Sequence, residues 1–127
     1  MTLPRVSLWS QFRDSEGQQI ELYRRSVTNL DYPPDQVRLY LCEGDSDDNT
    51  LAELQAWAIE DDRLTVVQHD TGIPHYAHSP RLERMQARAR NGNVGWEAIV
   101  RDNWGEYALM LESDLIVQPN LLKSLIE

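Results

Sequence analysis

Four short apolar stretches recur along the chain, each about as long as a β-strand and each followed by polar residues. They are Val6 to Ser10, Val37 to Cys42, Leu64 to Gln68 and Tyr107 to Leu111. Because amphipathic segments separate these stretches, we expect four strands with helices between them.

The first two connecting segments have apolar residues at helical spacing. Gln18 to Leu30 carries apolar side chains three and four positions apart, and Asp31-Tyr32-Pro33-Pro34 stops this helix. A second helix is expected around Leu51 to Ala58, where Asn49 and Thr50 are the expected N-terminal caps.

A third helix is expected after the third strand. Pro80 fits its first turn, and Leu82, Met85 and Ala89 are expected on its apolar side. Asn91-Gly92-Asn93 is expected to break or bend this helix before it resumes over Val94 to Val100.

The complete order of elements predicts the fold class. A last helix is expected over Pro119 to Glu127, so strands and helices alternate throughout. This alternation favours an α/β fold, a Rossmann-like three-layer α/β/α arrangement with a mostly parallel sheet, in one domain over residues 1–127. In such sheets ligands bind outside the carboxyl ends of the strands, so the residues directly after each strand are the candidates for a site.

The net charge of the chain disfavours two classes of binding partner. Its 127 residues include 21 Asp and Glu against 12 Lys and Arg, for a net charge of -9. This is the wrong sign for non-specific attraction to nucleic acid or an anionic membrane, so an anionic ligand would need a local basic patch or a metal. The single Cys42 favours a reducing compartment, and without an apolar run of roughly 18 residues or a signal-peptide pattern we expect a cytoplasmic protein.

Polar runs follow all four expected strands. They are Gln11 to Asp14, Glu43 to Asp48, His69-Asp70 and Glu112-Ser113-Asp114. Parallel pairing would gather them at one edge of the sheet. The second run is interpreted either as a solvated acidic turn or, for Glu43, as a hydrogen-bond acceptor for a ribose or base.

The last polar run suggests a metal site. Alternation along an extended chain would point Glu112 and Asp114 the same way. Two carboxylates suit Mg²⁺ or Mn²⁺, which take one or two protein carboxylates and complete their coordination with water and substrate phosphates. On spacing alone this signal is weak, because such triplets also occur by chance.

Several arginines are further candidates for ligand binding. Arg81, Arg84 and Arg88 share one face of the expected third helix, with Arg90 and Arg101 nearby. This face either is solvated and pairs with surplus carboxylates or directs guanidinium groups at a phosphate.

Three histidines lie in or beside the loop expected over Asp70 to Ser79, after the third strand. His75 and His78 have a spacing that would suit a transition metal, but no cysteine accompanies them, and a structural role is favoured. His69 is better placed, at a strand end, where its expected role is to satisfy backbone groups.

Several types of active site are disfavoured because their characteristic sequence motifs are absent. The sequence has no G-x-G-x-x-G after the first strand, no P-loop Gly-Lys-Ser/Thr and no G-x-S-x-G. Dinucleotide oxidoreductases, P-loop ATPases and α/β-hydrolases are therefore disfavoured.

Three segments, in consistent order, resemble the nucleotide-binding half of GT-A glycosyltransferases. Cys42 to Thr50 resembles the acidic turn often written V-D-D-G-S-x-D-x-T, and Met110 to Pro119 resembles the D-x-D segment and its continuation. Arg88 to Asn91 resembles the Arg-Asn segment that precedes it. The arrangement is similar to family 2 enzymes and, more finely, to the Anp1/Mnn9-type branch.

The resemblance implies a metal-dependent glycosyltransferase, or its donor-binding half, that uses a UDP- or GDP-type sugar donor and an unidentified glycan, protein or lipid acceptor. It implies Mn²⁺ or Mg²⁺ on Glu112 and Asp114. The implied nucleotide-sugar contacts are Gln11, Phe12, Glu43, Arg88, Arg90 and Ser113.

The chain departs from the family pattern in three places. Ser10 to Arg13 replaces a common P-x-Y-N stretch, and Glu112 replaces the first Asp of D-x-D, with a side chain one methylene longer. The acceptor-binding half expected after the metal motif is absent from this chain, and no catalytic base is assigned because the family's base lies in that half.

Two rival functions remain open at this point. One is a non-catalytic α/β interaction domain whose sheet edge docks a partner chain, which allows a homodimer. The other is a nucleotidyltransferase, which is disfavoured because Gln11 to Gly17 supplies only Arg13 and Gly17 where a glycine-rich basic loop is expected.

Overall fold

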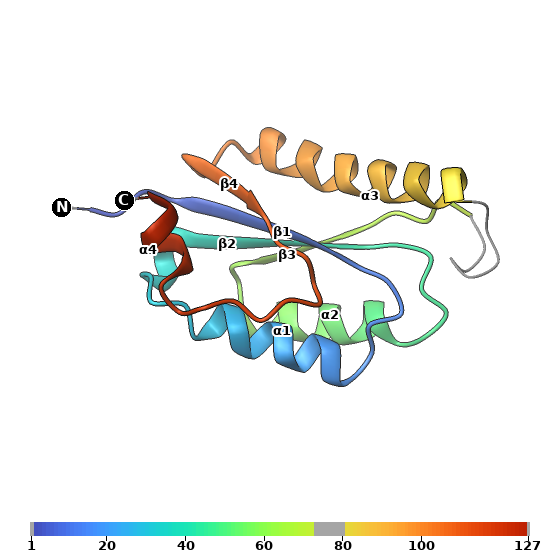
Figure 1. Cartoon of the computed structure of the whole chain (residues 1–127), viewed down its shortest axis with the longest axis horizontal. Coiled ribbons are helices and arrows are strands. Elements are labelled where there is room, and N and C mark those ends of the chain that lie inside the picture. Colours follow the sequence, from blue (N-terminus) through green and yellow to red (C-terminus); the bar gives the residue numbers. More distant parts are fainter. Residues whose placement is uncertain (1, 73–80, 127) are drawn as a thin grey trace.

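The computed structural model describes residues 2–72 and 81–126 and shows a sheet of four parallel strands in the order β3-β2-β1-β4 (Figure 1). The strands are β1 (Val6–Phe12), β2 (Val37–Glu43), β3 (Leu64–Gln68) and β4 (Tyr107–Met110). All four predicted strands are confirmed, and parallel pairing is complete among them.

Helices cover both faces of this sheet. Two of them, α1 (Gln18–Thr28) and α2 (Thr50–Glu60), lie on one face, and α3 (Arg81–Asp102) lies on the other (Figure 1). A 3-10 turn, η1 (Pro34–Gln36), leads into β2, and a short α4 (Leu121–Ile126) follows β4. The predicted three-layer α/β/α arrangement is therefore confirmed.

The larger part of the core lies between the sheet and α1 and α2. Leu8 and Leu39 from the central strands are buried there together with Tyr23 from α1 and Trp57 from α2. Tyr23 packs edge-on against Phe12, with ring centroids 5.0 Å apart. The helical spacing read from the sequence thus identifies the buried faces of these two helices.

The start of α2 differs in detail from the prediction. Asn49 makes no side-chain capping bond. Instead, Asp48 Oδ1 accepts a hydrogen bond from the Thr50 N–H at 2.9 Å. Thr50 Oγ1 accepts one from the Ser15 N–H at 2.7 Å, so it ties the start of α2 to the loop after β1.

The predicted break in α3 is wrong, because the helix continues through Asn91-Gly92-Asn93. A Cβ atom at Gly95 would lie 2.2 Å from Cys42 Sγ, and one at Gly92 would lie 2.9 Å from Gln11 Nε2. The glycines therefore let α3 approach the sheet closely, and this packing overrides their poor intrinsic helix propensity.

The expected apolar side of α3 is also corrected. Leu82 and Met85 are 66% and 58% exposed, whereas Ala87 and Ala98 are buried, and Ala98 packs with Tyr40 of β2. Asn91 and Ile99 are also buried on α3. Trp96 is 45% exposed and packs on Trp9 with ring centroids 5.5 Å apart.

None of the helices in the described part of the chain is both long and apolar enough to cross a membrane.

Candidate functional site

The parallel register places all four strand ends at one edge of the sheet. Phe12 pairs with Glu43, and Glu43 pairs with Gln68. Beyond β4, the Leu111 N–H donates to the Trp9 carbonyl at 2.9 Å. The predicted gathering of the polar runs is therefore confirmed.

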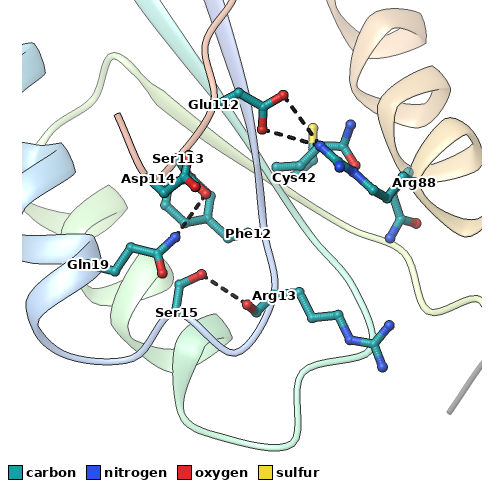
Figure 2. A pocket seen from close by; sticks show the side chains of 11 residues that line it. Phe12, Arg13, Ser15, Gln19, Cys42, Arg88, Glu112, Ser113 and Asp114 are labelled. Carbon is teal, nitrogen blue, oxygen red and sulfur yellow. Dashed lines mark hydrogen bonds and ion pairs between the residues drawn. The ribbon is translucent and has the colours of Figure 1, made fainter. Parts of the chain in front are cut away.

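A pocket of about 240 Å³ opens at this edge (Figure 2). Six residues that the resemblance implied in donor or metal binding line it, namely Gln11, Phe12, Arg88, Glu112, Ser113 and Asp114. The other lining residues are Arg13, Ser15, Gln19, Cys42 and Asn91. Residues from β1, α1, α3 and the segment after β4 thus meet in one place.

An ion pair forms one wall of the pocket. Arg88 Nη2 lies 3.3 Å from Glu112 Oε2 and 3.4 Å from Oε1 (Figure 2). The two side chains are 54% and 50% exposed, so water and salt screen their attraction. The contact joins α3 to the end of β4 at little energetic gain.

The opposite wall joins α1 to the same acidic segment. Gln19 Nε2 donates to Ser113 Oγ at 3.1 Å (Figure 2). The segment is a turn, in which the Leu115 N–H donates to the Glu112 carbonyl at 3.3 Å. The expected extended chain is therefore wrong beyond Met110, although Glu112 and Asp114 still border one pocket.

Opposite charges balance around the pocket. Arg13 and Arg88 line it together with Glu112 and Asp114. The Arg13 side chain is 7% exposed, and its Nε lies 3.9 Å from Asp14 Oδ2. With two positive and two negative groups lining it, the pocket has little net attraction for a diphosphate, and a divalent cation would make it positive.

The two carboxylates fit a divalent ion only as a partial ligand set. Among the residues that the structure describes, no three His, Cys, Asp or Glu side chains cluster as metal ligands. Glu112 and Asp114 supply hard oxygen atoms at the pocket, which is the minimum that Mg²⁺ or Mn²⁺ requires when phosphate and water provide the rest. The residues present therefore fit such an ion together with a phosphorylated ligand.

Glu43 lies outside the set of residues that line the pocket. Its side chain is buried, at 3% exposed, and its Oε1 accepts a hydrogen bond from the Ser46 N–H at 3.2 Å. Burial raises the pKa of its carboxyl group, hydrogen bonds from Ser46 oppose the rise, and nearby carboxylates add to it. The buried Glu43 side chain therefore supports the turn after β2 through its hydrogen bond with Ser46.

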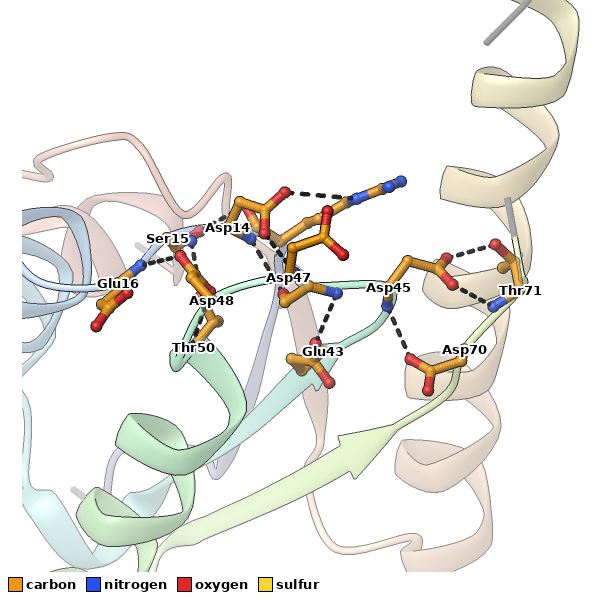
Figure 3. A network of polar contacts seen from close by, with 12 residues as sticks. Asp14, Ser15, Glu16, Glu43, Asp45, Asp47, Asp48, Thr50, Asp70 and Thr71 are labelled. Atoms are coloured by element: carbon orange, nitrogen blue, oxygen red, sulfur yellow. Dashed lines mark hydrogen bonds and ion pairs between the residues drawn. The ribbon is translucent and has the colours of Figure 1, made fainter. Parts of the chain in front are cut away.

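Two acidic residues of that turn, Asp45 and Asp48, join it to the loops after β3 and β1 (Figure 3). Asp45 accepts hydrogen bonds from the Thr71 and Gly72 N–H groups at 2.9 and 3.0 Å. Asp48 Oδ2 accepts one from the Glu16 N–H at 3.1 Å. These bonds give the acidic turn a structural function, beyond that of a solvated rim.

Two other described candidates, Arg90 and His69, are not among the residues that line the pocket. Arg90 is exposed and is not one of its lining residues. His69 Nδ1 and Asn91 Oδ1 are 2.8 Å apart, so the histidine ties the end of β3 to α3. His75 and His78 lie outside the described residues.

Ser15 and Gln19 line the pocket, although the sequence did not predict them as site residues. Ser15 precedes α1 and Gln19 belongs to its first turn. The signal was available, because the first turn of a helix that follows a parallel strand lies at the carboxyl edge of the sheet. Neither residue type stands out from the sequence alone.

No protein-family model and no curated protein matches this chain in sequence. Solved structures do match its fold. A 1–349 fragment of S. aureus TarS superimposes with a TM-score of 0.67 at 20% identity, covering 95% of this chain and 31% of that one. The same fragment in complex with UDP-GlcNAc gives a TM-score of 0.66 at 21% identity, covering 95% of this chain and 30% of the fragment.

A mannosyltransferase gives a similar result. PcManGT from Pyrobaculum calidifontis, in complex with GDP-Man and Mn²⁺, has a TM-score of 0.64 at 21% identity, covering 94% of this chain and 30% of that one. At these identities the likeness shows a shared α/β fold. The chain spans less than a third of the length of these proteins.

Proposed function

We propose that this chain is the donor-binding part of a GT-A-type glycosyltransferase that binds a nucleotide-diphospho-sugar with Mn²⁺ or Mg²⁺. The observation that carries the proposal is the convergence of Arg88, Glu112 and Asp114 on one charge-balanced pocket at the carboxyl edge of the sheet. Similar structures are complexes with UDP-GlcNAc, or with GDP-Man and Mn²⁺, which supports this class of ligand.

The lining residues divide into two groups by chemistry. Asp114 and Glu112 would hold the divalent ion, which when bound supplies positive charge against the departing nucleoside diphosphate. Arg88 would donate to the diphosphate, since a guanidinium group suits phosphate oxygens. Gln11 and Ser113 would offer hydrogen bonds to the nucleoside or sugar, beside the ring of Phe12.

Glu43 and Arg90 receive no direct ligand contact in this proposal. Glu43 would act through the turn that it supports, because its carboxyl group is buried and does not border the pocket. Arg90 would contribute only its charge to the surrounding field, because it is exposed on α3.

Sugar transfer by the whole protein is a further part of the proposal. Because this chain spans less than a third of the similar structures, the acceptor and the catalytic base are left unassigned. The Anp1/Mnn9-type branch and a cytoplasmic location are finer proposals, which rest on the motif order and on the single cysteine.

An interaction domain is the second candidate, and one observation favours it. The edge strand β4 and the neighbouring α3 expose Tyr107, Met110, Trp96 and Val100 by 56%, 41%, 45% and 57%. Exposed apolar residues beside an open sheet edge are typical of docking surfaces for another chain. Such a domain would form a complex, for example a homodimer, that ignores nucleotides.

The substitution Asp114→Ala tests the proposed ion site. Calorimetric titration with UDP and GDP in Mn²⁺ should show binding to the wild type, and the variant should fall to the affinity measured without metal. Asp62→Ala, which removes an exposed carboxylate before β3, should bind like the wild type. Undiminished Mn²⁺-dependent binding by a folded Asp114→Ala variant would overturn the metal role.

A further inference from the structure

The contact between Arg88 and Glu112 joins two groups that need different ligands. Both side chains line the pocket, 3.3 Å apart at their closest atoms. The proposed function assigns Glu112 to a divalent cation and Arg88 to the diphosphate. In the structure, the two side chains neutralise each other's charge by forming an ion pair.

A cation on Glu112 would weaken this contact directly. Arg88 Nη2 lies within 3.4 Å of both carboxylate oxygens, so it covers the atoms that a metal would use. A divalent ion beside that carboxylate also repels the guanidinium, because like charges at a few ångströms repel strongly even at the protein surface. The two partners therefore compete for one carboxylate.

Breaking the contact costs little. Both side chains are about half exposed, and exposed ion pairs contribute little to stability. Arg88 already lines the pocket, so it reaches a ligand there by rotating its own side chain. The other lining arginine, Arg13, is 7% exposed and close to Asp14, so Arg88 is the more exposed of the two cations.

From these contacts we infer that the Arg88–Glu112 ion pair is an exchangeable latch that couples metal binding to nucleotide binding. A divalent ion takes Glu112 and releases Arg88, which then donates to the diphosphate. This inference rests on the proposed function and adds a coupling mechanism to it. The reciprocity of binding equilibria requires the nucleotide to favour the metal by the same factor.

The first test measures metal binding without nucleotide. Mn²⁺ affinity is determined by titration for the wild type, Arg88→Gln and a control, Arg25→Gln, which removes an exposed arginine paired with Glu21 on α1. The latch predicts that Arg88→Gln binds Mn²⁺ about two- to fivefold more tightly than the control. An unchanged or weaker affinity would overturn it.

The second test measures UDP binding. In saturating Mn²⁺, Arg88→Gln should bind UDP about tenfold more weakly than the wild type, because a charged hydrogen bond is lost. Without metal, Glu112→Gln should bind UDP more tightly than the wild type, because Arg88 is released permanently. The double variant should lose that gain.

The outcomes separate the two proposals. A gain in Glu112→Gln that persists in the double variant would show a general charge effect and would overturn the latch. Wild-type protein that binds Mn²⁺ but never UDP would overturn the proposed function and the nucleotide half of the latch. Thermal unfolding of each variant checks that it is folded.

Discussion

A single buried carboxyl group supports the turn that follows β2. Glu43 is 3% exposed, one of its oxygens accepts a hydrogen bond from Ser46, and the other has no hydrogen-bond partner among the described residues. Its pKa is raised, chiefly by burial. The folded protein therefore holds the Glu43 proton to higher pH than the unfolded chain does.

This shift predicts how a neutral replacement changes stability. A raised carboxyl pKa contributes stability below the unfolded-state value, and that contribution is lost as pH rises through the folded-state value. Glu43→Gln stays neutral, so at pH 7 it should raise the free energy of unfolding. The gain should shrink toward the ordinary carboxyl pKa of about 4.3. Denaturant unfolding at several pH values measures this, and a gain that grows as pH falls would contradict it.

At the residue scale, the sequence predicted positions better than roles. Glu112 and Asp114 follow a strand, so topology alone brings them to the sheet edge where the pocket lies. The position of Glu43 was predicted in the same way. Its burial was not, because burial depends on how the loops after β1 and β3 fold over it.

Among the elements, α3 shows most clearly how packing overrides local preference. Its Asn91-Gly92-Asn93 segment has a poor helix propensity, yet the helix runs unbroken from Arg81 to Asp102. Gly95 lies against Cys42 and Trp9, and Asn91 contacts His69. These contacts involve residues distant in sequence, so helical periodicity does not reveal them.

Two alanine substitutions in α3 should have different effects. At Gly95 a Cβ would lie 2.2 Å from Cys42 Sγ and 3.2 Å from Trp9 Cδ1, so Gly95→Ala should destabilise the protein by about 1–3 kcal/mol. At Gly92 the new Cβ meets only the flexible end of Gln11, and the gain in helix propensity of up to about 1 kcal/mol offsets the contact.

The comparison of these two variants by urea unfolding tests the packing of α3. Gly92→Ala should be close to the wild type or slightly more stable. Equal stability of Gly95→Ala and Gly92→Ala would show that α3 does not approach Cys42 as closely as described.

At the scale of the whole molecule, the order of elements determined the fold, because alternating strands and helices allow few arrangements other than a parallel sheet covered on both faces. The order of the strands in the sheet and the two glycine contacts of α3 could not be predicted from the sequence and became known only from the structure. The proposed function depends on a local property of the pocket, in which charges balance although the chain has a net charge of -9.

This charge balance makes metal dependence the central claim. The most direct measurement is a calorimetric titration of the wild-type protein with UDP and GDP, each in Mn²⁺ and in a chelator. Metal should strengthen the binding of one nucleotide about tenfold or more, which lies within the usual range of coupling between two ligands. Equal affinity with and without Mn²⁺, or no binding by a folded sample, would contradict the account and favour the interaction domain.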